Sequence, residues 1–89
     1  MSEERIGRVT HYWPKAHAAQ VELEDAVLRK GDHIHIRGHG HDVEETVESI
    51  QIDHKPVSAG HPGEPVAIEV PDRVKEGDEV WRDTSSPKE

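Results

Sequence analysis

The sequence has no cysteine and no phenylalanine, and only three aromatic residues, Tyr12, Trp13 and Trp81. Without cysteine, disulfide bonds, thiolate metal sites and thiol catalysis are excluded, and the chain suits a reducing cytoplasm. No apolar run approaches the length of a membrane span, and residues 1–5 lack the apolar segment of a secretory signal. We therefore expect a soluble, cytoplasmic protein that does not enter a membrane.

Basic side chains are fewer than acidic ones. Eleven lysines and arginines stand against 19 aspartates and glutamates, which gives a formal net charge of −8. A surface of that sign repels phosphate backbones unless its cations gather on one patch. Eight histidines would take up positive charge below about pH 6, so the field of the protein should depend on pH. A chain of 89 residues predicts one domain with a core of barely sufficient size.

What the chain does have is a turn that occurs twice, at residues 28–32 and 74–78. Each copy places an aliphatic residue, two charged residues and a Gly-Asp pair directly ahead of an alternating segment. Glycine admits the positive φ of a tight turn, and aspartate can accept a hydrogen bond from the backbone that follows it. Valine, isoleucine and leucine total 18, of which 16 are β-branched, and they fall at alternating positions. This pattern predicts a fold of short β-strands.

Six strands are predicted, at residues 5–12, 16–24, 33–37, 42–53, 66–70 and 79–82. Gly7 indicates a bulge or a close approach of two backbones, and a change of apolar parity indicates a bulge near residues 48–49. The Pro- and Gly-containing segment 55–63 is predicted to be a loop. We expect a flexible N-terminus at residues 1–4, a single β-barrel domain at residues 5–82 and a flexible tail at residues 83–89.

In this order the strands and turns resemble the second domain of translation factors, the β-barrel of elongation factor Tu and its relatives. The matching motifs are Ile6-Gly7-Arg8-Val9 and the segments 28–32, 46–52, 59–66 and 75–80. Within them, residues 6–12, 47–52 and 74–78 are similar to small stand-alone translation-barrel-like proteins and to the C-terminal barrel of collagenase-type peptidases. The resemblance implies an all-β fold, a six-stranded closed barrel with Greek-key connections.

In translation factors this domain contacts ribosomal RNA or the acceptor end of tRNA. The resemblance therefore implies a non-catalytic module that docks on ribosomal RNA, tRNA or a translation-associated protein. It does not imply GTP hydrolysis, because the chain lacks the G-x-x-x-x-G-K-[ST] loop that holds a nucleotide triphosphate. We expect no enzyme activity, no cofactor and a monomer. An alternative is an accessory domain that positions a separate peptidase-like enzyme, whose catalytic part lies outside the barrel.

The expected docking surface is the loop that holds Tyr12, Trp13 and Lys15. Aromatic side chains beside a lysine can stack on an unpaired base or enter a groove of a protein. Arg8 and Arg37 are predicted to join this loop in a local basic patch. The alternative interpretation is that the two aromatic residues cap one end of a barrel that is poor in aromatic side chains.

A group of histidines, His33, His35, His39 and His41, gives a second hypothesis. His33 and His35 share one face of a predicted strand, so their imidazoles can bind Zn²⁺ or Ni²⁺ with a third ligand such as Asp42. The alternative is a solvated face that responds to pH. Catalysis has no support in the sequence, because no nucleophile is paired with an oriented base.

Overall fold

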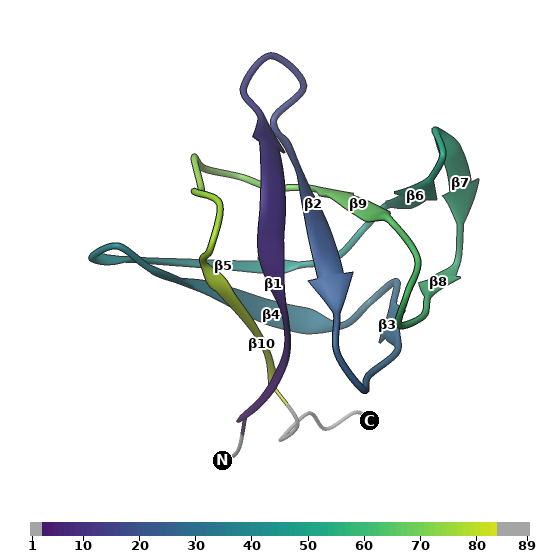
Figure 1. Cartoon of the computed structure of the whole chain (residues 1–89), viewed down its shortest axis with the longest axis horizontal. Coiled ribbons are helices and arrows are strands. Elements are labelled where there is room, and N and C mark those ends of the chain that lie inside the picture. The colour runs from purple at the N-terminus through teal and green to yellow at the C-terminus, as the bar shows by residue number, and fades with distance from the viewer. Residues whose placement is uncertain (1–2, 84–89) are drawn as a thin grey trace.

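The computed structural model describes residues 3–83, and all regular secondary structure among them is β-strand (Figure 1). The strands are β1 (Glu3–Trp13), β2 (Ala18–Leu23), β3 (Leu28–Arg29), β4 (His33–Gly38), β5 (His41–Thr46), β6 (Ile50–Ile52), β7 (Lys55–Val57), β8 (Ala59–Gly60), β9 (Val66–Glu69) and β10 (Glu79–Asp83). Residues 1–2 and 84–89, which make up most of the two ends predicted to be flexible, lie outside the described residues. Glu3 and Asp83 pair with each other at the ends of β1 and β10.

Eight strands form one antiparallel sheet in the order β5-β4-β10-β1-β2-β9-β6-β7, and β3 pairs separately with β8. Figure 1 shows β1 and β2 passing in front of β4 and β5, so the sheet curls strongly. The expected all-β class is confirmed. The prediction of six strands closed into a barrel is not, because no ladder joins β5 to β7 among residues 3–83 and the strands number ten. A short segment after β5, residues 47–49, divides one predicted strand into two.

The core consists of aliphatic side chains from the inner face of the curled sheet. The alternation predicted for the second strand is confirmed, since Ala19, Val21 and Leu23 are buried and the residues between them are not. The same holds for Ile34 and Ile36 in β4. The buried hydrophobic residues are Ile6, Val9, Ala19, Val21, Leu23, Leu28, Ile34, Ile36, Val43, Val47, Ile50, Val66, Ile68, Val70, Val74 and Val80.

Two sequence-based predictions about the middle of the chain are wrong. The predicted long strand at 42–53 is divided into β5, at one end of the main sheet, and β6, beside β9. Val47 lies between them and bonds to the first Gly-Asp turn, through its N–H to Asp32 and through its carbonyl to Gly31. The predicted loop at 55–63 contains β7 and β8. Pro56 fits there because β7 is the last strand of the sheet, where one side of the backbone needs no partner.

The two Gly-Asp turns adopt the same structure. In each, the glycine has a positive φ, 96° at Gly31 and 94° at Gly77, and the aspartate N–H bonds to the carbonyl three residues earlier. Each aspartate carboxylate accepts the backbone N–H three residues earlier, at 3.0 Å for Asp32 and 2.9 Å for Asp78. The carboxylate thus closes the turn that precedes it, and does not bond to the following backbone as the sequence led us to expect. The repeat is confirmed as a structural unit.

Gly7 allows β1 and β2 to approach closely, as one of its two sequence interpretations predicted. The register between β1 and β10 also shifts between Arg5 and Gly7. A Cβ atom at Gly7 would lie 2.2 Å from the carbonyl oxygen of Glu22, which belongs to a paired strand and cannot move away easily. Both interpretations, a bulge and a close approach, are therefore confirmed at this residue.

We expect Gly7→Ala to lower the free energy of unfolding by about 3 kcal/mol, because the added methyl group overlaps the backbone of β2. Urea unfolding measures the difference. Gly31→Ala is a matched control, since its Cβ would meet no atom within 4 Å but its φ is +96°. It reports the cost of the dihedral angle alone, about 1 kcal/mol. Equal losses in the two variants would contradict the close-approach explanation.

Glu45 is a carboxylate held near the core. It pairs in register with Ile34, and its Oε2 atom is buried without a hydrogen-bond partner among the described residues. Burial, with the nearby charges of Glu69 and Glu48, raises the pKa of Glu45 to about 7. The folded chain therefore binds a proton more tightly than the unfolded chain. Stability then falls as the pH rises from about 4.5 to about 7, and stays at the lower level above that range.

Glu45→Gln should therefore raise the free energy of unfolding at pH 8 by about 1 kcal/mol, after allowance for the partial exposure of the carboxyl group. At pH 4 the variant and the parent should be equally stable, since Glu45 is then protonated in both states. Urea unfolding at the two pH values gives the comparison. An equal gain at both would show that ionisation is not the cause.

Candidate functional site

A hollow of about 410 Å³ lies on the outer face of the sheet. Its floor includes Gln20, Ala67 and Gln51, which are paired in one row across β2, β9 and β6. Ala18 extends this floor on β2. Alanine at outward positions of two strands leaves room that larger side chains would fill, so the hollow follows directly from small residues on the solvent side.

One wall of the hollow is formed by Trp13, the last residue of β1, and by Lys15 in the β1–β2 loop. Trp13 is the exposed large hydrophobic residue of the described chain, with 37% of its surface accessible. The ring of His11 meets it edge-on, with 4.5 Å between ring centroids. The opposite wall is the tight turn between β6 and β7, where Asp53 and His54 both have positive φ.

The structure separates Tyr12 from Trp13. Tyr12 pairs in register with the buried Ala19 and packs against the core, whereas the next side chain points outward. Tyr12 thus fits the alternative interpretation of the sequence, in which an aromatic residue covers the core. Trp13 and Lys15 line the hollow together, as a docking surface requires. Their predicted binding role stays a prediction.

The two arginines assigned to a basic patch do not line this hollow. Arg8 is paired with Glu22, its Nη2 atom 3.0 Å from the carboxylate. Arg37 forms two parallel contacts to Glu3, of 2.7 and 2.9 Å, and a third to Asp42 of 3.1 Å. Each arginine charge is therefore balanced by carboxylates of other strands, Glu22 of β2 for Arg8, and Glu3 of β1 with Asp42 of β5 for Arg37. The sequence shows both signs of charge but cannot show which pairs the strand register brings together.

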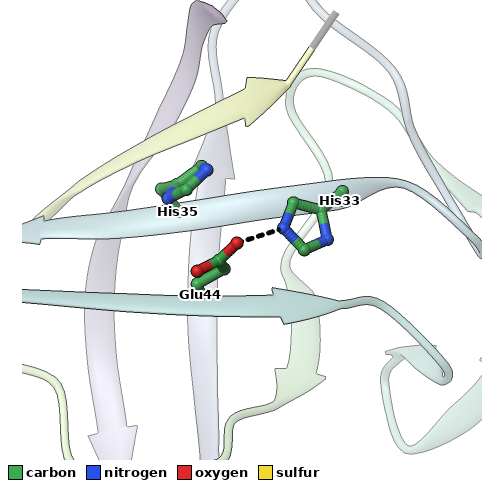
Figure 2. A group of neighbouring side chains, drawn as sticks. All are labelled: His33, His35 and Glu44. Atoms are coloured by element: carbon green, nitrogen blue, oxygen red, sulfur yellow. Dashed lines mark hydrogen bonds and ion pairs between the residues drawn. The ribbon is translucent and has the colours of Figure 1, made fainter. Parts of the chain in front are cut away.

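The four candidate histidines fall into two separate groups. His33 and His35 lie with Glu44 on the outer side of β4 and β5, and one ligand atom from each of the three lies within 4.8 Å of the others (Figure 2). His33 Nε2 is 2.8 Å from Glu44 Oε2, and the two imidazole centroids are 5.5 Å apart. Glu44 was missed by sequence reasoning, because it becomes a neighbour only through the β4–β5 register, in which it opposes His35.

His39 and His41 form hydrogen bonds with a different carboxylate, that of Asp78. His39 Nδ1 is 2.5 Å from one oxygen of Asp78, and His41 Nε2 is 2.6 Å from the other. Asp78 is fully buried and is the charged residue within the described core. Burial alone would raise the pKa of Asp78, but the Lys75 N–H and the two imidazoles together hold it below its ordinary value. These two histidines are thus partners of a structural turn.

No family model matches the chain. In sequence, the chain is 42% identical over 77 residues to an uncharacterised protease of Methanocaldococcus jannaschii. The aligned segment covers 85% of this chain and 19% of the protease. The chain thus spans about a fifth of the length of this relative. The described residues contain no helix with the length and apolar character needed to cross a membrane.

Solved structures show the same fold in the C-terminal domain of a protein described as a U32 peptidase, from Geobacillus thermoleovorans. One structure has a TM-score of 0.82 at 21% identity and covers 91% of this chain and 93% of that domain. The selenomethionine variant of the domain has a TM-score of 0.78 at 24% identity, over 90% and 99% of the two chains. The expected likeness to the barrel of collagenase-type peptidases fits these findings, whereas the likeness to translation factors stays a prediction. In fold, this chain is similar over nearly its whole length to the C-terminal domain of that peptidase.

Proposed function

We propose that the chain is a non-catalytic accessory domain that docks on the catalytic part of a peptidase of the U32 type. The observation that carries the proposal is the match in extent. The similar fold covers nearly all of the Geobacillus domain and nearly all of this chain. The similar sequence covers about a fifth of the M. jannaschii protease. We assign catalysis to the remaining four fifths of such a protease, which the match does not cover.

The described side chains support a role without catalysis. The nearest approach to a catalytic arrangement is the Thr46 hydroxyl, 3.2 Å from His33 Nδ1, with Glu44 on the other ring nitrogen. A hydrolytic triad works in a site that excludes water and aims hydrogen-bond donors at the developing oxyanion. Here the side chains of His33 and Glu44 are 36% and 59% exposed. The arrangement is therefore open to solvent on a strand surface.

The hollow beside Trp13 is the surface that best fits a docking partner. An exposed tryptophan next to a concave floor of alanines can receive an apolar side chain of another domain, and tryptophan contributes strongly to binding at such positions. Lys15 and Asp53 at the rim add polar contacts of both signs. Such a surface suits a protein better than a phosphate backbone, because the chain is acidic and its nearby Arg8 is already paired.

Docking on ribosomal RNA, tRNA or a translation-associated protein is the competing proposal, which derives from the resemblance to translation factors. Ionic strength distinguishes an RNA partner from an apolar protein partner. RNA binding should weaken steeply between 50 and 200 mM salt, on the order of tenfold or more, whereas apolar docking should change little.

The experiment uses the M. jannaschii protease with its matching 77-residue segment deleted, mixed with this chain after nuclease treatment. We expect the two proteins to co-elute in size-exclusion chromatography and to bind with a stoichiometry of one to one by calorimetry. The deleted segment, supplied as a separate chain, is the positive control. If that segment binds and this chain does not, the proposal is wrong.

A chimera covers the case in which the shortened protease does not fold. In it, residues 3–83 of this chain replace the matching segment of the full-length protease. The accessory-domain proposal predicts that the chimera unfolds in one transition near that of the parent and keeps its peptidase activity. An independently unfolding, detached domain would contradict the proposal.

A further inference from the structure

His33, His35 and Glu44 are placed as metal ligands by two adjacent strands. The histidines are two residues apart on β4, so both project from the same face, and Glu44 opposes His35 across the β4–β5 ladder. The three side chains lie together on that face in Figure 2. Their ligand atoms fall within 4.8 Å of one another. Atoms that share one tetrahedral ion with bonds of about 2 Å lie about 3.3 Å apart, so small side-chain rotations would bring the three onto one ion.

His35 is held in the orientation that a metal ligand needs. Its Nε2 atom is 3.2 Å from Glu3 Oε2, so the Nε2–H group can donate to that carboxylate. The Arg37 guanidinium donates two hydrogen bonds to Glu3, of 2.7 and 2.9 Å, which hold that carboxylate in place behind His35. The proton on Nε2 leaves the lone pair on Nδ1. A carboxylate behind a ligating histidine is the usual partner in protein metal sites, where it fixes the tautomer.

The free nitrogen of His35 faces the carboxylates of β5. Its Nδ1 atom is buried and has no hydrogen-bond partner among the described residues, although Asp42 Oδ1 approaches to 3.5 Å. Asp42 is itself held by Arg37, whose Nε atom is 3.1 Å from Oδ2. A buried polar atom without a partner is costly, and a bound cation would satisfy it. The ligand atoms that lie together are those of His33, His35 and Glu44, so Glu44 takes the place of Asp42, the third ligand suggested by the sequence.

His33 has the matching arrangement on the other side of Glu44. Its Nδ1 atom is 3.2 Å from the hydroxyl oxygen of Thr46, which can accept the Nδ1–H proton. Nε2 lies 2.8 Å from Glu44 Oε2 and shares a proton with it, and a bound ion would take the place of that proton. His33 is therefore supported by Thr46 behind one nitrogen and has Glu44 at the other, and His35 is supported by Glu3 behind Nε2 and has its buried Nδ1 atom available to an ion.

We propose that His33, His35 and Glu44 form a binding site for a divalent transition-metal ion of the Zn²⁺ type, with the remaining coordination position open to water. Two imidazoles and one carboxylate select Zn²⁺, Ni²⁺ or Cu²⁺ over Mg²⁺ and Ca²⁺, which prefer oxygen ligands. The site lies on β4 and β5, at the opposite end of the sheet order from the hollow on β9 and β6. It does not depend on the proposed docking function.

Isothermal titration calorimetry of the full chain with Zn²⁺ at pH 7.5 tests the site. We expect one ion per chain, and no heat with Mg²⁺. Loss of a residue that only supports a ligand weakens metal binding by 10- to 100-fold, so His33→Gln and Glu44→Gln should each weaken it by about 100-fold or more. His39→Gln is the matched control and should leave the affinity unchanged, because His39 belongs to the Asp78 group.

Fluorescence gives a second readout that locates the ion. Trp81 is paired in register with His35, and the chain has one other tryptophan, Trp13. In Trp13→Phe, the emission therefore comes from Trp81 alone, and stoichiometric Cu²⁺ should quench it. Adding His33→Gln should remove the quenching at the same concentration.

The outcomes separate the proposal from its competitors. Absence of Zn²⁺ binding by the folded parent chain at millimolar concentration would overturn it. Binding that is lost in His39→Gln and kept in His33→Gln would also overturn it, by placing the ion at the other histidine pair. Circular dichroism confirms folding of each variant. His33→Gln carries the test if His35→Gln unfolds, since the His33 side chain is 36% exposed against 15% for His35.

Discussion

Asp78→Ala is expected to lower the free energy of unfolding by about 3 kcal/mol or more, a large fraction of the stability of a domain of this size. The carboxylate is fully buried and accepts hydrogen bonds from the Lys75 N–H, His39 and His41. Its removal leaves the turn N–H without an acceptor and leaves a cavity beside the β4–β5 hairpin. Urea unfolding at pH 7 measures the loss.

Asp32→Ala is the matched control for this prediction. Asp32 occupies the same position in the first turn and accepts the same kind of backbone hydrogen bond, from Arg29. Its side chain is 25% exposed, however, and water can replace part of what is lost. Arg82 Nη1 also donates to this carboxylate, at 3.3 Å, so we expect a loss of about 1 to 2 kcal/mol, the usual net value of two partly exposed hydrogen bonds. Equal losses at the two turns would show that burial of Asp78 does not set the magnitude.

The lowered pKa of Asp78 also fixes the pH range of its contribution. Because the folded chain holds this pKa below its ordinary value, the stabilisation is fully present above about pH 4. It is lost as the pH falls further, through the pKa of the folded state. The difference in unfolding free energy between the parent chain and Asp78→Ala should therefore shrink as the pH falls below about 4, down to the part that comes from the cavity. A difference that grows as the pH falls would contradict the ionised role of this side chain.

Trp13→Ala is expected to weaken docking on the shortened M. jannaschii protease by about 30-fold or more. An exposed tryptophan at the edge of a hollow loses a large apolar contact when it is truncated, and such residues contribute 2 kcal/mol or more at interfaces. With 37% of its surface accessible, Trp13 offers part of its ring to a partner and keeps the rest packed on this chain, so stability is measured alongside affinity. Calorimetric affinity, with thermal unfolding as the check on stability, gives the result.

Two further variants, one inside the hollow and one outside it, locate the contact. Ala67→Glu fills the floor of the hollow with a charged side chain and should abolish docking as Trp13→Ala does. Arg37 lies on β4, outside the hollow. Arg37→Gln should therefore leave the docking affinity unchanged, although it is expected to lower the free energy of unfolding slightly. If Arg37→Gln abolishes docking while Trp13→Ala does not, the partner uses the other face.

The inward-facing residues of this fold could be read from the sequence because burial follows strand alternation. Val21 and Ile36 are examples, and the repeated turn was visible as Gly-Asp pairs whose geometry depends on neighbouring residues. The break at Val47 was not, because it depends on two backbone bonds to a turn 15 residues away. A parity change in the sequence is equally consistent with a bulge.

The candidate sites show the same division between local and distant information. The i, i+2 spacing of His33 and His35 placed them on one face, as observed. Glu44 joins them only through strand register, and His39 leaves them because the β4–β5 turn carries it to Asp78. The hollow was missed because its floor combines three strands. Its one local signal was an alanine such as Ala67 at an outward-facing position of a strand.

The most direct test of the docking account is an NMR titration of the ¹⁵N-labelled chain with the shortened M. jannaschii protease, with the assigned amide and indole signals followed. The account predicts that chemical-shift changes and line broadening concentrate at Trp13, Ala18, Gln51 and Ala67 around the hollow. Absence of change at saturating protease, or changes confined to the face formed by β4 and β5, would contradict it.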